Sequence, residues 1–347
     1  MRKTPKRHLN PWPSFIFYPF TFILVLGSCF LVSCEPSVEE SIYEEKLVVF
    51  GNLIADLPVI DTVFVSLSYQ IEEPHEQETK WIADADVVLS DGKSSFPLSP
   101  VPGKPGRYLD LTFSHIVQPG TTYRLNVTWE DHEVGAATAV PDAFSLASIS
   151  SSEWKCGGES VVVPAIDLRE GENSPEKIEH ALMTKDFTIL AMDTVIYREG
   201  DCWSTSFASI PLFILRWESD YEPGLIRIIS LALDDTATNA IVDTSLSGTA
   251  FKGPMYRDTD GNYYRPNPFV WNAKQQEQHI NWIYFNYYGP HLMTVVATDQ
   301  SAHDYFQGDP FRINQYVLPN GNIEGGYGLF SSAYARSFFV YVAPDEP

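Results

Sequence analysis

The stretch Pro119–Trp129, PGTTYRLNVTW, shows the β character of this chain most clearly. Every second residue from Tyr123 to Trp129 is large and apolar, and the residues between them are polar or charged. That period of two predicts a strand that buries one face and exposes the other. Pro119 and Gly120 ahead of it are typical of a turn, so we expect the chain to enter this strand from a tight turn.

The same alternation recurs on the N-terminal side, at residues 62–69, 85–89 and 108–113. The second of these runs leads into Asp91-Gly92, a pair typical of hairpin turns. A tyrosine near the start of a strand, as at Tyr123, resembles the tyrosine corner of immunoglobulin-like sandwiches. Recurring strands with turns between them therefore predict an immunoglobulin-like β-sandwich over residues 46–141.

The rest of the chain, residues 149–343, has weaker periodicity but many apolar and aromatic strand candidates. They lie at residues 187–197, 210–217, 225–233, 280–288, 292–298 and 337–342. The residues after Asp299 can form a short helix that Asp299 caps. These patterns predict an all-β protein in which a larger, mostly antiparallel β domain with a short helix follows the sandwich.

The N-terminus has the features of an export signal. Four basic residues within residues 1–7 precede an almost wholly apolar run over residues 15–32. The run closes on Ser33-Cys34, and a small residue directly before a cysteine resembles the cleavage site of a bacterial lipoprotein signal. We therefore predict a signal peptide over residues 1–33 and a lipid anchor on Cys34. The alternatives are a retained membrane helix and an ordinary secreted protein.

The part of the chain that follows this signal is strongly acidic. The whole chain has 23 Lys and Arg against 45 Asp and Glu. Residues 1–33 hold four of the cations and no acid, which leaves 19 cations against 45 acids, a net charge of −26. Such a charge repels nucleic-acid backbones, so we expect no nucleic-acid partner. Residues 34–45 hold five glutamates and are predicted to be an acidic tether.

Two cysteines, Cys156 and Cys202, remain outside the signal and the lipid site. In an oxidising compartment such a pair favours a disulfide, which would stabilise the fold by about 4 kcal/mol through the loop that it closes. Two free buried thiols are the main alternative. A metal site is the third, although no His or Cys stands at ligand spacing beside either cysteine.

No residue pattern typical of catalysis stands out. The sequence has no Gly-x-Ser-x-Gly elbow, no phosphate-binding glycine loop and no histidine pair at a zinc spacing. Asp258, Asp260 and Asn262 suggest calcium, but Gly261 lies at the wrong position for an EF-hand loop, and a hairpin turn explains them more simply. We therefore expect no catalytic residues, no metal, no cofactor and no enzyme activity.

A group of aromatic residues in the C-terminal half has two interpretations. The group comprises Trp271, Trp282, Tyr284, Tyr287 and Tyr288. Aromatic residues are common in strands and in hydrophobic cores. They are also common on surfaces that stack a ligand or a partner. Core packing is the favoured interpretation, and a ligand or partner surface is the alternative.

Four segments together resemble one known family, domain-of-unknown-function family 4249. They are LVVFGNLI at 47–54, ADADVVLSDG at 83–92, PGTTYRLNV at 119–127 and NIEGGYGLF at 322–330. The glycines at 325, 326 and 328 permit a tight loop or close backbone approach before a final strand. The resemblance covers nearly all of residues 35–342, apart from the region of Cys156 and Cys202 and the acidic loop 167–180.

The resemblance implies a Bacteroidetes lipoprotein, a class often encoded beside TonB-dependent receptors. In such lipoproteins an acidic cluster after the lipidated cysteine resembles a signal for the outer face of the outer membrane, which slightly favours the cell surface over the periplasmic face. We therefore predict a lipid-anchored accessory binding or interaction protein of the outer membrane, acting with a TonB-dependent receptor in nutrient capture. The alternatives are a structural or adhesive surface component and an enzyme without a recognisable motif.

Overall fold

Strands make up most of the regular structure of this protein. The computed structural model describes residues 43–69, 80–198, 202–203, 209–218, 225–241, 256–257, 263–264, 267–273, 275–306 and 320–345. Within these ranges the helices are few and short, and one large mixed sheet contains twelve strands. The predicted all-β class is confirmed.

The predicted strands of the N-terminal half form, with some changes of length. They are β1 (Leu47–Ile54), β2 (Val63–Leu67), β3 (Asp86–Ser90), β4 (Ser95–Pro100), β5 (Arg107–Leu109), β6 (Thr122–Trp129) and β7 (His132–Ala139). β5 is shorter than predicted because the Asp110 side chain accepts hydrogen bonds from the backbone N–H groups of Thr112 and Ser114, which folds the chain into a loop. β3 and β4 pair as the predicted hairpin.

The strand β6 has the alternating burial that its sequence predicts. Tyr123 at its start is fully buried, and its hydroxyl oxygen accepts a hydrogen bond from the backbone N–H of Gln118 at 3.1 Å. A tyrosine corner has such a bond between the phenol and a nearby backbone group. The immunoglobulin-like character of the sandwich stays a prediction.

The C-terminal half adds strands to the large sheet and forms three small sheets. Its strands are β8 (Ser145–Ile149), β9 (Ser151–Cys156), β10 (Glu159–Val163), β11 (Asp193–Tyr197), β12 (Phe213–Glu218), β13 (Leu225–Ala232), β14 (Tyr256–Arg257), β15 (Tyr263–Tyr264), β16 (Phe269–Ala273), β17 (Glu277–Ile280), β18 (Gly289–Thr298) and β19 (Tyr327–Pro344). β14 and β15 pair with each other. Residues 258–262 between them, which hold the Asp258, Asp260 and Asn262 that suggested calcium, lie outside the described residues.

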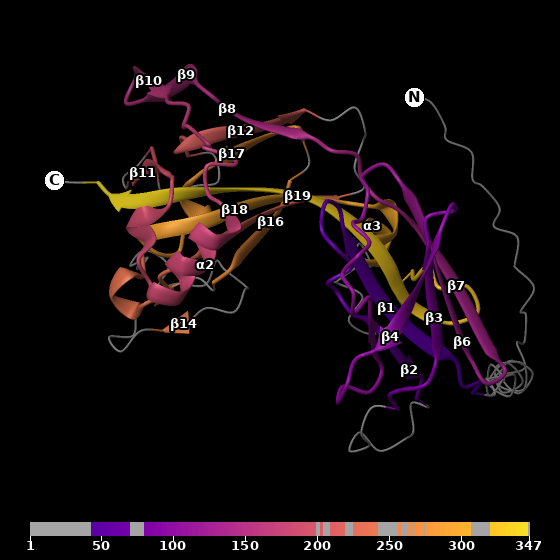
Figure 1. The fold of residues 1–347 in the computed structure, drawn as a ribbon. Coiled ribbons are helices and arrows are strands. Elements are labelled where there is room, and N and C mark those ends of the chain that lie inside the picture. The colour runs from indigo at the N-terminus through magenta and orange to yellow at the C-terminus, as the bar shows by residue number, and fades with distance from the viewer. Residues whose placement is uncertain are drawn as a thin grey trace, which may run out of the picture. The chain divides into compact units, whose positions relative to one another are not determined.

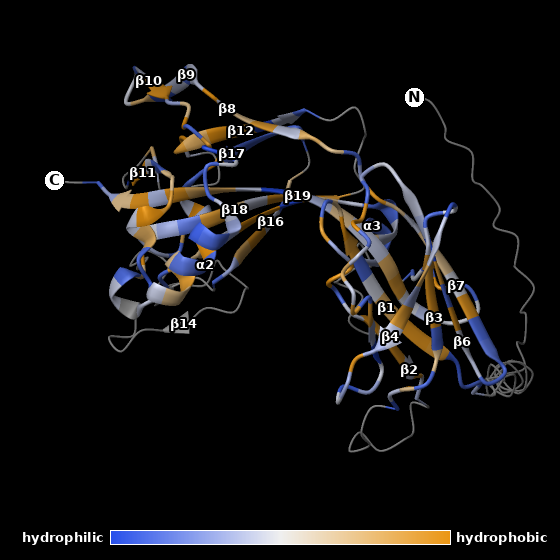
Figure 2. Cartoon of the chain, viewed as in Figure 1, coloured by the Kyte–Doolittle hydropathy of each residue, from blue (hydrophilic) through white to orange (hydrophobic). Residues whose placement is uncertain are grey.

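Two α-helices are present in the described residues. α3 (Gln300–Phe306) is the predicted short helix, and the Asp299 carboxylate accepts a hydrogen bond from the backbone N–H of Ala302 at 3.1 Å, as a helix cap does. α2 (Pro175–Thr184) was not predicted. Its only buried side chain is Ala181, and Figure 2 shows mostly hydrophilic colour on this helix.

The long strand β19 pairs with strands from both halves of the chain. Its first part runs parallel to β1, with Val48 opposite Tyr327 and Ile54 opposite Ala333. Its second part is antiparallel to β18 and parallel to β11, and Figure 1 shows it in yellow. Just before β19, Glu324 and Gly135 of β7 exchange two backbone hydrogen bonds. Residues 320–333 therefore complete the pairing of the N-terminal strands.

From residue 45 onward, the described residues form one compact unit. The boundaries predicted at 46–141 and 149–343 stay a prediction, and the shared strand β19 is the main contact that crosses them.

Close backbone contact explains a glycine in the segment NIEGGYGLF at 322–330. Gly328 has a φ of +117°, and a Cβ at this position would collide with the carbonyl oxygen of Val49. Only glycine therefore lets β19 lie against β1 at this point. The Asn322 side chain fixes the same segment, since its amide donates to the carbonyl oxygens of Ala137 and Phe330 at 3.0 and 2.7 Å.

A buried polar group joins three elements near this point. The Thr138 hydroxyl of β7 lies 2.7 Å from the Asp299 carboxylate and 2.6 Å from the Ser332 hydroxyl of β19. All three side chains are almost inaccessible to solvent. We call Thr138, Asp299 and Ser332 the Asp299 joint. It ties β7, β19 and the start of α3 together through hydrogen bonds that are buried away from solvent.

Candidate functional site

An open pocket of about 420 Å³ lies on the N-terminal strands. Its lining residues are Trp81, Lys104, Pro105 and Arg107, and we call it the Trp81 pocket. The volume lies within the roughly 300–1,000 Å³ of small-molecule sites. No pattern in the sequence marks these residues as a site.

The Trp81 wall of the pocket is held by the edge of β2. Trp81 forms a β-bridge with Ser66, and the backbone N–H of Ile82 donates to the carbonyl oxygen of Val65 at 3.2 Å. Ile82 is buried, and its own carbonyl accepts a hydrogen bond from the Tyr108 hydroxyl at 2.8 Å. Because its neighbour is anchored in the core, Trp81 faces outward and keeps 41% of its surface exposed.

The opposite wall is the turn between β4 and β5. The backbone N–H of Val101 donates to the carbonyl of Arg107 at 2.8 Å, and the N–H of Lys104 donates to the carbonyl of Val101 at 3.1 Å. Gly106 has a φ of +72°, and a Cβ on it would collide with the Trp81 ring and with the carbonyl oxygen of Val65. The absence of a side chain at Gly106 therefore lets the indole pack directly on the turn.

Arg107 is positioned by an aromatic neighbour. It lies directly opposite Phe64 in the β2–β5 pair, and its guanidinium carbon is 5.0 Å from the centre of the Phe64 ring. The Phe64 and Trp81 rings are 6.2 Å apart between centroids. A cation over an aromatic face at this distance is attracted to the ring, so Arg107 is held beside the indole.

A second exposed feature lies on two loops that pair with each other. Pro58, after β1, forms an antiparallel bridge with Ile116, after β5. Val59 and Val117 are buried and anchor the loops. Five other large apolar side chains on these loops are 39–48% exposed: Leu57, Ile60, Leu111, Phe113 and Ile116. We call these five residues the apolar loop surface. Several exposed apolar groups on neighbouring segments are typical of a protein-interaction surface.

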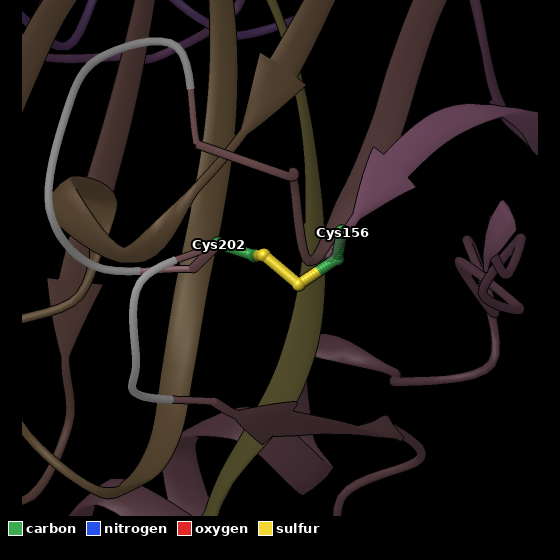
Figure 3. The surroundings of a disulfide bond; sticks show 2 residues. All are labelled: Cys156 and Cys202. Carbon is green, nitrogen blue, oxygen red and sulfur yellow. A yellow bond between two sulfur atoms is a disulfide. The ribbon is translucent and has the colours of Figure 1, made fainter. Parts of the chain in front are cut away.

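The structure places the cysteines that the sequence singled out as follows. Cys156, at the end of β9, forms a disulfide with Cys202, and their Cα atoms are 5.8 Å apart (Figure 3). The disulfide ties the β9–β10 hairpin to the segment that precedes β12. Cys34, the predicted lipidation site, lies outside the described residues.

The predicted aromatic surface is not a single surface in the structure. Trp282, Tyr284 and Tyr287 are buried to at least 93%, and Trp271 and Tyr288 are half-buried. Tyr284 packs edge-on against Phe269 in the core, whereas Tyr288 packs against Tyr197 elsewhere. Core packing therefore fits these residues. The alternative, a ligand or partner surface, is wrong for Trp282, Tyr284 and Tyr287, because buried side chains cannot contact a ligand at the surface.

The strand predicted over residues 280–288 is also corrected. β17 ends at Ile280, and a short 3-10 helix, η4 (Trp282–Tyr284), follows with Asn281 as its cap. All residues from 281 to 287 are buried, so this segment has no exposed face of the kind that a half-buried strand shows. Two further 3-10 helices, η1 (Phe187–Ile189) and η2 (Ala237–Asn239), lie in loops.

One histidine is buried on the inner face of β18. His291 is fully inaccessible, its Nδ1 lies 3.1 Å from the carbonyl oxygen of Gly289, and its ring meets Phe285 edge-on. Burial lowers the pKa of His291 to about 4, so the imidazole is neutral at physiological pH. Among the described side chains no group of three or more His, Cys, Asp or Glu could hold a metal ion.

The signal that could have indicated the Trp81 pocket was weak. Trp81 follows a polar segment, and the turn PGKPGR at 102–107 places two cations among prolines and glycines. Nothing in either segment alone shows that they meet, because β2 brings them together by pairing with both. A pocket shared by two loops is a property of strand order, which local sequence patterns do not fix.

The fold and the pocket define an all-β protein with an open surface site of cationic and aromatic character. The chain matches the family model described as Domain of unknown function (DUF4249) over residues 33–337, and it belongs to that family. The resemblance found in the sequence is thereby confirmed. No curated protein matches the chain. Within the described ranges, no helix has both the length and the apolar character needed to cross a membrane.

Proposed function

We propose that this protein is a lipid-anchored binding protein of the outer membrane that works with a TonB-dependent receptor in nutrient capture. The observation that carries this proposal is the Trp81 pocket. An exposed indole that shares a pocket with two cations suits reversible binding of a small ligand. Its four described lining residues include no carboxylate, imidazole, thiol or hydroxyl that could act as a general base, which favours binding over catalysis.

The apolar loop surface supports the partner in this proposal. Its five side chains lie on loops that are fixed to the core through Val59 and Val117. A preformed apolar surface loses little conformational freedom when a partner covers it. The predicted lipid on Cys34 would keep the protein in the membrane that holds the receptor.

Site-specific crosslinking in the native membrane tests the proposal. A photoreactive amino acid at Ile60 in the full-length lipoprotein is expected to crosslink to a TonB-dependent receptor, identified by mass spectrometry. The same group at Met183, which is 78% exposed on α2, is the matched control and should not. Crosslinking to no receptor at Ile60, or equally at both positions, would contradict the proposed role.

A further inference from the structure

The charge of the Trp81 pocket is opposite to that of the chain. The protein has 45 acidic and 23 basic residues, yet the charged residues that line the pocket are Lys104 and Arg107. Within the described residues neither of these cations forms an ion pair, whereas nearby Lys80 pairs with Glu45 at 2.9 Å. Two cations at one pocket, neither with an ion-pair partner in the part of the chain that the structure describes, favour an anionic ligand, which the rest of the acidic surface would repel.

The apolar part of the pocket narrows the class of that ligand. The Trp81 indole, which is 41% exposed, and the Pro105 ring give the open pocket an apolar lining. A pyranose ring has one face of C–H groups, which packs on an indole, while its hydroxyl groups stay at the rim in contact with water. Because the pocket is open, a chain of such units could cross it with one unit bound.

The cationic part is arranged for a carboxylate or a sulfate group. Arg107 is held by its strand and by the Phe64 ring, so its planar fork loses little freedom on binding. A guanidinium donates two parallel hydrogen bonds to a carboxylate or a sulfate. Lys104 is exposed on the turn and adds a second charge that can follow the ligand.

We infer that the Trp81 pocket binds an acidic saccharide, with one sugar ring on the Trp81 indole and its acid group between Lys104 and Arg107. This inference rests on the proposed binding function and names the class of ligand that the protein captures. The acid group is a carboxylate of a uronic acid or a sulfate ester, and the experiment separates the two.

Calorimetric titration of the full mature protein tests the inference. The probes are oligogalacturonate, which carries carboxylates, its fully methyl-esterified form, which is neutral, and heparin oligosaccharides, which also carry sulfates. We expect at least one acidic probe to bind, and the neutral form to bind about tenfold more weakly or not at all. Trp81→Ala and Arg107→Gln should each weaken binding about tenfold, whereas Lys93→Gln, on the β3–β4 turn, should not.

The inference would be overturned by equal binding of the neutral form, by no effect of Trp81→Ala, or by failure of every acidic probe to bind. Poly-glutamate, tested as a competitor, should not displace the saccharide, and equal binding of poly-glutamate would also overturn it. The crosslinking experiment at Ile60 is independent of these titrations. Receptor crosslinking without saccharide binding would refute the ligand class alone, whereas saccharide binding without crosslinking would refute the receptor partner alone.

Discussion

The indole of Trp81 packs over the backbone of Gly106, so this glycine decides the shape of the pocket at the scale of single residues. Sequence alone marks Gly106 as one more turn glycine, because Gly103 in the same turn has the same φ of +72°. The difference lies in the surroundings: a Cβ on Gly103 would meet open space, whereas one on Gly106 would meet Trp81 and the backbone of Val65.

We expect Gly106→Ala to lower the free energy of unfolding by about 2–4 kcal/mol, through backbone strain and collision together. Gly103→Ala adds backbone strain without a collision, so it should lower the free energy of unfolding by about 1–2 kcal/mol. Urea denaturation of both variants measures the difference. Equal losses in the two variants would show that Trp81 does not pack against Gly106.

The buried imidazole of His291 predicts a dependence of stability on pH. Its folded pKa of about 4 lies below the ordinary value near 6.5, so the unfolded chain binds a proton in a range where the folded protein does not. The free energy of unfolding should therefore fall as the pH drops from about 6.5 to about 4, by about 3 kcal/mol in total from this group.

His291→Leu should remove this part of the pH dependence, and the exposed His180→Gln on α2 is the control. Denaturation midpoints between pH 7 and pH 4 measure the effect. If the wild-type protein and His291→Leu lost stability in parallel over this range, the buried neutral imidazole would not be the cause.

At the scale of secondary structure, the strands with a clean period of two were predicted well. β6 alternates buried and exposed residues over most of its length, so its sequence carries the pattern directly, whereas β18 alternates only buried and half-buried residues. The strand prediction for residues 280–288 was wrong. Their aromatic content favours a strand, but the segment is buried on all sides and forms η4 instead. Ser174 and Pro175 are typical of a helix N-cap and a first helical residue, so they could have indicated α2. The helix was not predicted because few of its residues form an apolar stripe.

The two helix caps differ in burial, and we expect their removal to differ in cost. Asp299→Ala removes the cap of α3 and leaves the buried hydroxyl of Thr138 without its carboxylate acceptor, so it should lower the free energy of unfolding by about 3 kcal/mol. Ser174→Ala removes the exposed cap of α2 and should cost about 1 kcal/mol. Chemical denaturation compares them, and similar small losses would mean that the Asp299 joint contributes little.

At the scale of the whole molecule, the sequence predicts two successive modules, but the contribution of residues 320–333 to the first one was not foreseeable. A parallel pair between β1 and β19 joins the first and last strands of the described residues, and no local pattern records which distant strands become neighbours. The same limit applies to the Trp81 pocket, whose two walls come from separate loops. The alternation of apolar and polar residues and the four family-like segments, in contrast, predicted the β class and the family.

A fragment of residues 46–141 alone should therefore fail to fold cooperatively. It would leave β1 without its parallel partner and β7 without its contact to Glu324. Adding residues 320–333 after residue 141 through a flexible linker should restore a cooperative transition, followed by circular dichroism on heating. A shorter fragment that unfolds as sharply as the longer one would show that β19 is not needed there.

The claim that the Trp81 pocket binds an acidic saccharide is tested most directly by NMR of the tryptophan indole N–H groups during titration with the acidic probe that binds. The Trp81→Phe variant assigns the resonance of Trp81. We predict that this resonance moves and saturates with ligand, while the other indole resonances stay in place. A Trp81 resonance that does not move while the ligand binds would contradict the claim.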